Sequence, residues 1–252
     1  MKIQFCSDLH LEFKDNKNFL RENPIVPVGD ILLLAGDIVP FTVMDDHDDF
    51  FDFVSDNFKQ AYWIPGNHEY YYSDIAVKPF SFQEKIRSNV SLVNNVAISE
   101  SNVKFIFSTM WSKIRPADMR TIQQSMSDFK VIKKNEGIFN PQDFNELHNL
   151  CLAFISDQLK INNIDKTIVV THHIPTFLNY PEKYKGDILN DAFAVELFDL
   201  IEGSKADAWI YGHNHFNQPN FRIGSTNLLT NQLGYVKFGE NTGFSHNNLI
   251  FI

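Results

Sequence analysis

Short strings of histidine, aspartate, asparagine and glycine are the part of this sequence whose residue types could carry chemistry. Six of the nine histidines fall in them. The strings are Asp8-Leu9-His10, Gly36-Asp37, Gly66-Asn67-His68-Glu69, His172-His173 and Gly212-His213-Asn214-His215. Imidazole, carboxylate and amide groups are metal ligands when they converge. The strings therefore predict a metal site.

Each string follows an apolar run that is typical of a strand. The predicted strands cover residues 3–6, 31–35, 61–64, 103–108, 168–171, 208–211 and 249–252. Apolar residues at steps of three and four predict helices over 50–58, 144–159 and 192–201. Alternating strands and helices indicate an α/β architecture, in which ligands bind at the carboxyl ends of the strands. After Asp207, short strands with turn residues predict an antiparallel sheet that closes the chain.

The ligand types narrow the choice of metal. Carboxylate, amide and imidazole groups suit Mn, Fe, Zn or, with fewer imidazoles, Mg, and the strings hold no thiolate. Seven side chains are candidate ligands: Asp8, His10, Asp37, Asn67, His172, His213 and His215. Seven ligands are too many for one ion and fit two ions that share a bridging carboxylate. Such pairs, roughly 3.5–4 Å apart, serve in-line displacement at phosphorus.

In this order the strings resemble the motifs of the calcineurin-like metallophosphoesterases. The likeness also includes residues 109–112, 171–175 and 231–235, so it extends from the start of the chain to about residue 240. The resemblance implies an α/β fold of the four-layer αββα type, in which two β-sheets are flanked by helices. It also implies a metal-dependent phosphoric ester hydrolase.

Carried over to this chain, the resemblance assigns a role to each site residue. One ion would be held by Asp8, His10, Asp37 and His215, and the other by Asp37, Asn67, His172 and His213. Asp37 would bridge the two ions, and a metal-bridging hydroxide would attack phosphorus. His68, which is not a ligand, would be the catalytic general acid that protonates the leaving oxygen.

Composition bounds the remaining possibilities. The 252 residues, 44% of them hydrophobic and 21% charged, predict one globular domain over 1–252. The net charge of -9 repels a polyanion and argues against duplex nucleic acid as a partner. Cys6 and Cys151 indicate neither a disulfide framework nor a structural zinc site. The sequence lacks an apolar stretch of about 18 residues and a signal-peptide pattern, so we expect a cytoplasmic protein that does not enter a membrane.

Residues 111–140 differ in charge from the rest of the chain. They hold six basic and three acidic residues, a local charge of +3, and show no strong periodicity. We interpret them as a lid or loop excursion, with Arg115 and Arg120 as candidate substrate contacts; a solvated basic surface is the alternative. His173 is a further candidate substrate contact, or else a residue that fills the rim. Glu69 either orients neighbouring groups or makes a structural hydrogen bond.

The predicted function is hydrolysis of a phosphate mono- or diester, with a small-molecule or short phosphoester as substrate. Two divalent or mixed-valence ions, Mn, Fe, Zn or Mg, are the predicted cofactors. Two alternatives stay open: a catalytically weak scaffold or binding module on the same fold, and a nuclease of the same chemistry. The natural substrate, the native metal and the oligomeric state are not determined by the sequence.

Overall fold

Two β-sheets form the centre of the computed structural model, which describes residues 1–161 and 166–252. The first sheet contains β1 (Lys2–Cys6), β2 (Ile31–Ala35), β3 (Gln60–Ile64), β4 (Phe82–Arg87), β5 (Val90–Asn94) and β14 (Leu249–Phe251). The second contains β6 (Val96–Glu100), β7 (Val103–Ser108), β10 (Lys166–Thr171), β11 (Ala208–Tyr211), β12 (Phe221–Ile223) and β13 (Thr226–Thr230). All seven predicted strands are present, with ends that differ by at most two residues.

Both sheets have the same plan, four parallel strands with an antiparallel strand at each edge. The orders are β14-β1-β2-β3-β5-β4 and β12-β13-β11-β10-β7-β6. The prediction of an antiparallel sheet after Asp207 is therefore wrong for β13, which runs parallel to β11. The reason is that β12 lies on the far side of β13, so the turn at Gly224 brings the chain back in the direction of β11.

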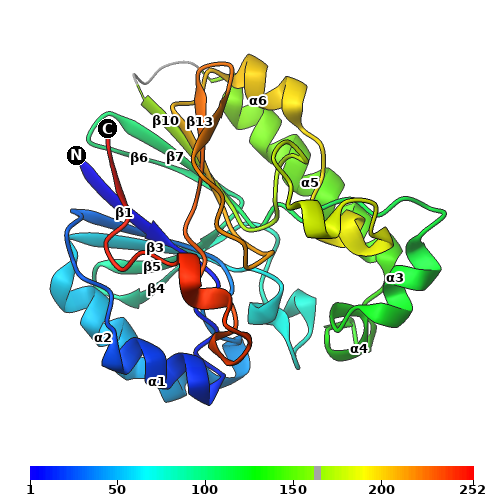
Figure 1. Ribbon diagram of the computed structural model, residues 1–252, viewed down its shortest axis with the longest axis horizontal. Helices are drawn as coiled ribbons and strands as arrows, with labels where there is room; N and C mark the ends of the chain where they lie inside the picture. Colours follow the sequence, from blue (N-terminus) through cyan, green and yellow to red (C-terminus); the bar gives the residue numbers. More distant parts are fainter. Residues whose placement is uncertain (162–165) are drawn as a thin grey trace.

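Helices cover the outer face of each sheet, as Figure 1 shows. α1 (Lys14–Glu22) and α2 (Asp48–Asn57) pack on the first sheet, and α5 (Pro141–Leu159) and α6 (Phe198–Ser204) pack on the second. The predicted four-layer αββα sandwich is thus confirmed. In the described part of the chain, no helix is both long and apolar enough to cross a membrane.

The layer between the sheets is apolar on both sides. Phe5, Leu33 and Ile64 of the first sheet pack with Phe105 and Ile168 of the second, and all five are buried. Strands covered on both faces have no solvent-facing side, which explains their nearly continuous apolar sequences. This layer fixes the two sets of strand ends relative to each other.

Helix α5 shows how the sequence determines the outer layer. The Asn140 side chain accepts hydrogen bonds from the backbone N–H groups of Gln142 and Asp143, and the Asp143 side chain accepts one from the backbone of Asn140. This capping box, with Pro141 at the first turn, starts the helix. Its buried stripe includes Phe144 and matches the predicted spacing.

The predicted helix over 192–201 is only partly correct. Residues Ile188–Ala192 form a 3-10 turn, and α6 begins at Phe198. Between them, the backbone of Ile174 donates to the carbonyl of Phe193 and accepts from Val195. These bonds to the loop after β10 replace the helical bonds that the apolar spacing predicts.

Residues 111–140 form two short helices, α3 (Met119–Ser125) and α4 (Asp128–Val131), and a hairpin of β8 (Lys133–Lys134) and β9 (Gly137–Ile138). In Figure 1, α3 and α4 lie at the right of the molecule, below the lower end of α5. Buried Trp111, Phe129 and Phe139 join the hydrophobic cluster that contains Phe144. The segment is therefore anchored to the core by its aromatic side chains.

The layer between the sheets should dominate stability. Phe105→Ala should lower the free energy of unfolding by about 3–5 kcal/mol, because it opens a cavity in a fully buried layer. Phe251→Ala, at a side chain that is 74% exposed, is the matched control and should change it by less than about 0.5 kcal/mol. Urea denaturation of both variants tests this, and equal midpoints would contradict the placement of Phe105.

Candidate metal centre

Four donor side chains from both sheets converge at one end of the sandwich. Asp8 and His10 follow β1, Asp37 follows β2, and His215 follows β11. The Nε2 atoms of His10 and His215 lie 2.9 Å apart, and Oδ1 of Asp8 lies 3.5 Å from Nε2 of His215. One ligand atom from each of the four lies within 4.8 Å of the others. We name these four residues the first donor group.

A second donor group lies beside the first and consists of Asp37, Asn67, His172 and His213. Nε2 of His172 is 3.2 Å from Oδ1 of Asn67, 3.1 Å from Nδ1 of His213 and 3.3 Å from Oδ2 of Asp37. All four side chains are buried. The two groups therefore contain all seven predicted ligands, with Asp37 in both.

Asp37 connects the two groups because its oxygens have different partners. Oδ1 accepts a hydrogen bond from the backbone N–H of His68 at 2.9 Å. Oδ2 faces His172 and also lies 3.8 Å from Nε2 of His10. Burial by itself would raise the pKa of Asp37, but the surrounding imidazoles hold that pKa well below its usual range. The carboxylate is thus ionised, and it is the donor that both groups share.

Backbone strain is concentrated at these ligands. Five of the seven have a positive φ: Asp8, His10, Asp37, His213 and His215. Residues other than glycine rarely adopt a positive φ, and this conformation persists only where the surrounding structure enforces it. Gly66 lies so close to Asp37 and His172 that a Cβ there would collide with both side chains. The loops are shaped to bring polar side chains together at short range.

Glu69 holds two of these loops together. Its carboxylate accepts hydrogen bonds from the backbone N–H groups of Asp37, Ile38 and Gly66 and from the indole N–H of Trp63, at 2.7–3.0 Å. Burial and the nearby Asp37 charge raise the pKa of Glu69 to about 8, and the N–H donors only partly oppose this rise. Glu69 makes the structural hydrogen bonds that were one of its two predicted roles, and these bonds fix the position of Asp37.

The imidazoles of the two groups have different supports. In the first group, Nδ1 of His10 lies 3.3 Å from Glu12 and Nδ1 of His215 lies 2.7 Å from Glu240. In the second group, His172 and His213 contact backbone carbonyls, those of Ala35 and Ala192. A carboxylate that accepts from an imidazole raises the basicity of the other ring nitrogen more than a carbonyl does. The first group is therefore the more negative of the two.

The donor set fits a pair of metal ions. Burial and neighbouring imidazoles hold the pKa of His213 well below its usual range, so this ring is neutral and has a lone pair to offer. The ring nitrogens of His10 and His215 point at each other across 2.9 Å, where at most one can carry a proton. Nitrogen and oxygen ligands without sulfur suit Mn, Fe, Zn or Mg. The residues in place thus match what two ions require.

His68 stands next to the donor groups and has its own set of partners. Nδ1 lies 3.1 Å from Oε1 of Glu12, Nε2 lies 3.3 Å from the hydroxyl of Tyr235, and the ring stacks on Tyr71 at 4.0 Å. Burial opposes protonation, but Asp37 and Glu12 raise the pKa of His68 to about 9. The protonated ring faces a cavity of about 300 Å³ that lies over the donor groups.

Three carboxylates at the centre were not found from the sequence. Glu12 and Glu240 contact ligand imidazoles, and Asp128 accepts hydrogen bonds at 2.8 Å from the amide of Asn67 and the hydroxyl of Tyr71. Because the Nδ2 group of Asn67 donates to Asp128, Oδ1 of Asn67 is turned toward His172. Glu12, four residues after Asp8, lies close to a ligand string, but no spacing distinguishes Asp128 or Glu240 from surface acids.

The three predicted substrate contacts are not among the residues that line the cavity. The guanidinium of Arg115 pairs with Asp118 and Asp191, and Arg120 is exposed on α3. His173 is fully buried behind the ligands and packs against Trp111 and His213. Residues 111–140 contribute buried Asp128 to the centre rather than a cation.

Comparison with known proteins agrees with the geometry. The family model for calcineurin-like phosphoesterases matches residues 1–217. The chain belongs to the calcineurin-like phosphoesterase family. An uncharacterised protein of Acanthamoeba polyphaga mimivirus is 32% identical over 263 residues, covering 92% of this chain and 91% of the viral protein.

A solved structure of a phosphopantetheinyl hydrolase from Mycobacterium tuberculosis has the same fold. The match has a TM-score of 0.72 at 15% sequence identity and covers 99% of this chain and 95% of that chain. For this member of the calcineurin-like phosphoesterases, family membership supports hydrolase activity, and the donor groups supply candidate metal ligands.

Glu69 should contribute strongly to stability. Glu69→Gln replaces one acceptor oxygen with an N–H₂ group that faces N–H donors, so the free energy of unfolding should fall by about 1–3 kcal/mol. Glu182→Gln, at an exposed side chain, is the control and should have no measurable effect. Thermal or urea unfolding of metal-free protein checks this. Similar free energies of unfolding for the two variants would contradict the structural role assigned to Glu69.

Glu240 should tune metal binding at the first donor group. Glu240→Gln retains an acceptor for His215 but removes the negative charge, so the affinity of one of two Mn²⁺ binding steps should fall by about 10–100-fold. Calorimetric titration of stripped protein measures this. Glu202→Gln, at an exposed glutamate on α6, should bind like the wild type. Unchanged affinity in Glu240→Gln would show that this carboxylate does not act on the metal.

Proposed function

We propose that the protein is a binuclear metal-dependent phosphoesterase that hydrolyses a small or short phosphate mono- or diester. The observation that carries this proposal is the arrangement of seven donors, six of them buried, in two groups around the shared Asp37 carboxylate. The first group would hold one divalent ion and the second group the other. Mn, Fe, Zn and Mg are the candidate ions. Such a pair supplies charge neutralisation at phosphorus and a water of lowered pKa as nucleophile.

The residues around the donors account for positioning and proton transfer. Glu12 fixes Nδ1 of His68, so the proton to be transferred is the one on Nε2, which lies 3.3 Å from the hydroxyl of Tyr235 in the cavity wall. As the water oxygen bonds to phosphorus, the bond from phosphorus to the leaving oxygen breaks, and the proton of Nε2 passes to that oxygen. The stacked ring of Tyr71 keeps the imidazole in place.

The general-acid role can be separated from metal binding. His68→Ala should keep two ions per chain, because all seven ligands remain, yet kcat should fall by about 10²–10⁴-fold for an alkyl or nucleoside ester. A nitrophenyl ester leaves as a stabilised anion and should lose much less. The measurement is the ratio of wild-type to variant kcat on both esters, with the metal content of the same samples.

His246→Ala is the matched control, because His246 packs against Phe19 and Phe244 and lies outside the site. It should retain wild-type kcat. Loss of an ion in His68→Ala, or an equal loss on both esters, would show that the proton comes from another group.

A further inference from the structure

We propose that the substrate is a monoanionic phosphodiester with an apolar or aromatic group on each side of phosphorus, rather than a dianionic monoester. This inference rests on the proposed function and narrows it. It derives from two properties of the cavity over the donor groups, its charge and its aromatic walls. The lining residues are Asp37, Asn67, His68, Tyr71, Ser125, Met126, Ser127, Tyr184, Phe193, His213, Asn214, His215, Tyr235 and Glu240.

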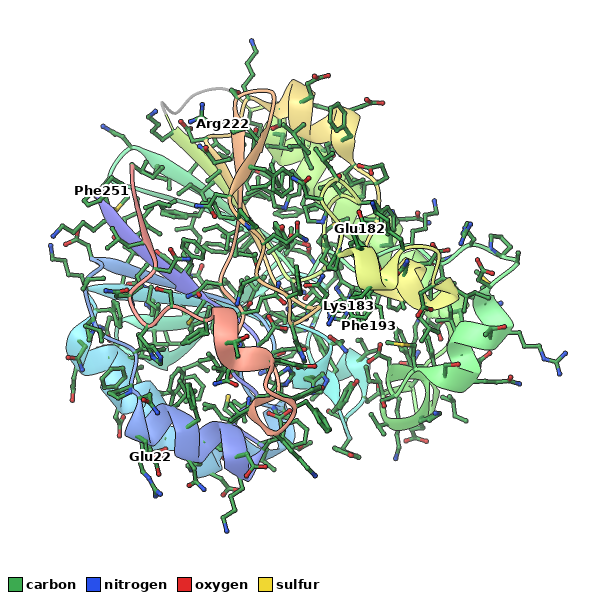
Figure 2. The ribbon with its side chains drawn as sticks, in the orientation of Figure 1. Glu22, Glu182, Lys183, Phe193, Arg222 and Phe251 are labelled. Atoms are coloured by element: carbon green, nitrogen blue, oxygen red, sulfur yellow. The ribbon has the colours of Figure 1, made fainter. Side chains whose placement is uncertain are left out.

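The first property is the lack of a cationic side chain in the wall. Within the described chain, no lysine or arginine lines this cavity. Arginine is the side chain best suited to bind a phosphate dianion, because its guanidinium donates two parallel hydrogen bonds. Lys183 is at the margin, where its ammonium lies 4.5 Å from the ring centroid of Tyr184 and 5.6 Å from that of Phe216. Figure 2 labels Lys183 and Phe193, which both come from the chain between β10 and α6.

Carboxylates at the centre offset most of the positive charge that metal ions bring. Two divalent ions carry four positive charges, and four carboxylates face them or their imidazole ligands: Asp8, Asp37, Glu12 and Glu240. The carboxylate charges equal the charges of the two ions in number, so little positive charge would remain for the substrate, and this favours a monoanion. A dianion would bring a second negative charge into a site of low dielectric with no partner for it.

The second property is a pair of aromatic walls. On the side of the general acid, Tyr71 stacks on His68 at 4.0 Å, and Tyr235 reaches His68 through its hydroxyl. On the side of the second donor group, Phe193 packs on His213 at 4.8 Å. The leaving group belongs beside His68, so the wall at Phe193 faces a second substituent on phosphorus. A monoester has no second organic substituent, whereas a diester has one.

Three substrates with the same leaving group test the effect of substrate charge and the effect of the aromatic wall at Phe193 separately in Mn-loaded protein. They are p-nitrophenyl phosphate, a dianion, and two monoanions, p-nitrophenyl methylphosphonate and p-nitrophenyl phenylphosphonate. We expect kcat/KM for the phenylphosphonate to exceed that for the phosphate by about tenfold or more. The phenylphosphonate should also exceed the methylphosphonate. A preference for the phosphate, or equal values for the two phosphonates, would overturn the inference while the proposed function stands.

Binding provides a readout without turnover. Diphenylphosphinate, a monoanion, should bind to Mn-loaded protein more tightly by calorimetry than phenylphosphonate, a dianion, and the reverse order would overturn the inference. If the loaded protein hydrolyses none of the three nitrophenyl substrates, the proposed function itself is wrong and the inference fails with it.

Two variants test whether the cavity wall at Ser127 and Phe193 determines the substrate preference. Ser127→Arg places a guanidinium at the exposed Ser127 position in the wall and should raise the ratio of kcat/KM for phosphate over phenylphosphonate by about tenfold. Ser88→Arg, in the exposed turn between β4 and β5, is the matched control and should leave the ratio unchanged. Phe193→Ala should abolish the advantage of the phenyl over the methyl group. An unchanged ratio in Ser127→Arg, or an unchanged phenyl advantage in Phe193→Ala, would count against the assignment.

Discussion

The Asp37 carboxylate is the point on which the centre depends. One oxygen is held by the backbone of His68, which leaves the other between an imidazole of the first sheet and an imidazole of the second. This is possible only if the carboxyl ends of β2 and β10 are a fixed short distance apart. The apolar layer between the sheets sets that distance, and backbone hydrogen bonds between Ser7 and the segment after β13 close the same end. Packing far from the ligands therefore determines the geometry at Asp37.

Such a centre opposes folding in two ways. Its polar side chains are buried, and five ligand residues hold left-handed backbone conformations, which together raise the energy of the metal-free protein. Hydrogen bonds close to the ligands offset part of this energy. Glu69 satisfies three backbone N–H groups of the two loops that carry Asp37 and Asn67, and both Asp8 oxygens accept from the backbone of His213. The same bonds that offset burial also pre-set the ligand positions, so stability and metal binding are linked.

The sequence predicted the residues that converge in the two donor groups because each follows a strand with a recognisable apolar pattern, and strand ends of parallel sheets meet at one edge. It did not identify the acids that support them. Asp128 and Glu240 reach the centre from segments distant in sequence, through contacts that only the folded chain creates. For a related reason, the charge count over 111–140 did not show that Arg115 is paired with Asp191. The helix over 192–201 was partly wrong because backbone bonds to Ile174 outweighed the apolar spacing.

The supporting carboxylates have two opposed effects on the chemistry. Glu12 and Glu240 accept from His10 and His215 and so make the first donor group a stronger ligand set. The same negative charges reduce what a pair of ions can offer to a phosphate. A site that relied on cationic side chains for substrate binding could avoid this cost, but its wall would then need an arginine or lysine, and the described wall has neither. Tight retention of metal and the proposed preference for substrates of low charge would therefore be two consequences of one arrangement. The aromatic rings of Tyr71 and Phe193, which pack on His68 and His213, would then hold the organic parts of the proposed substrate.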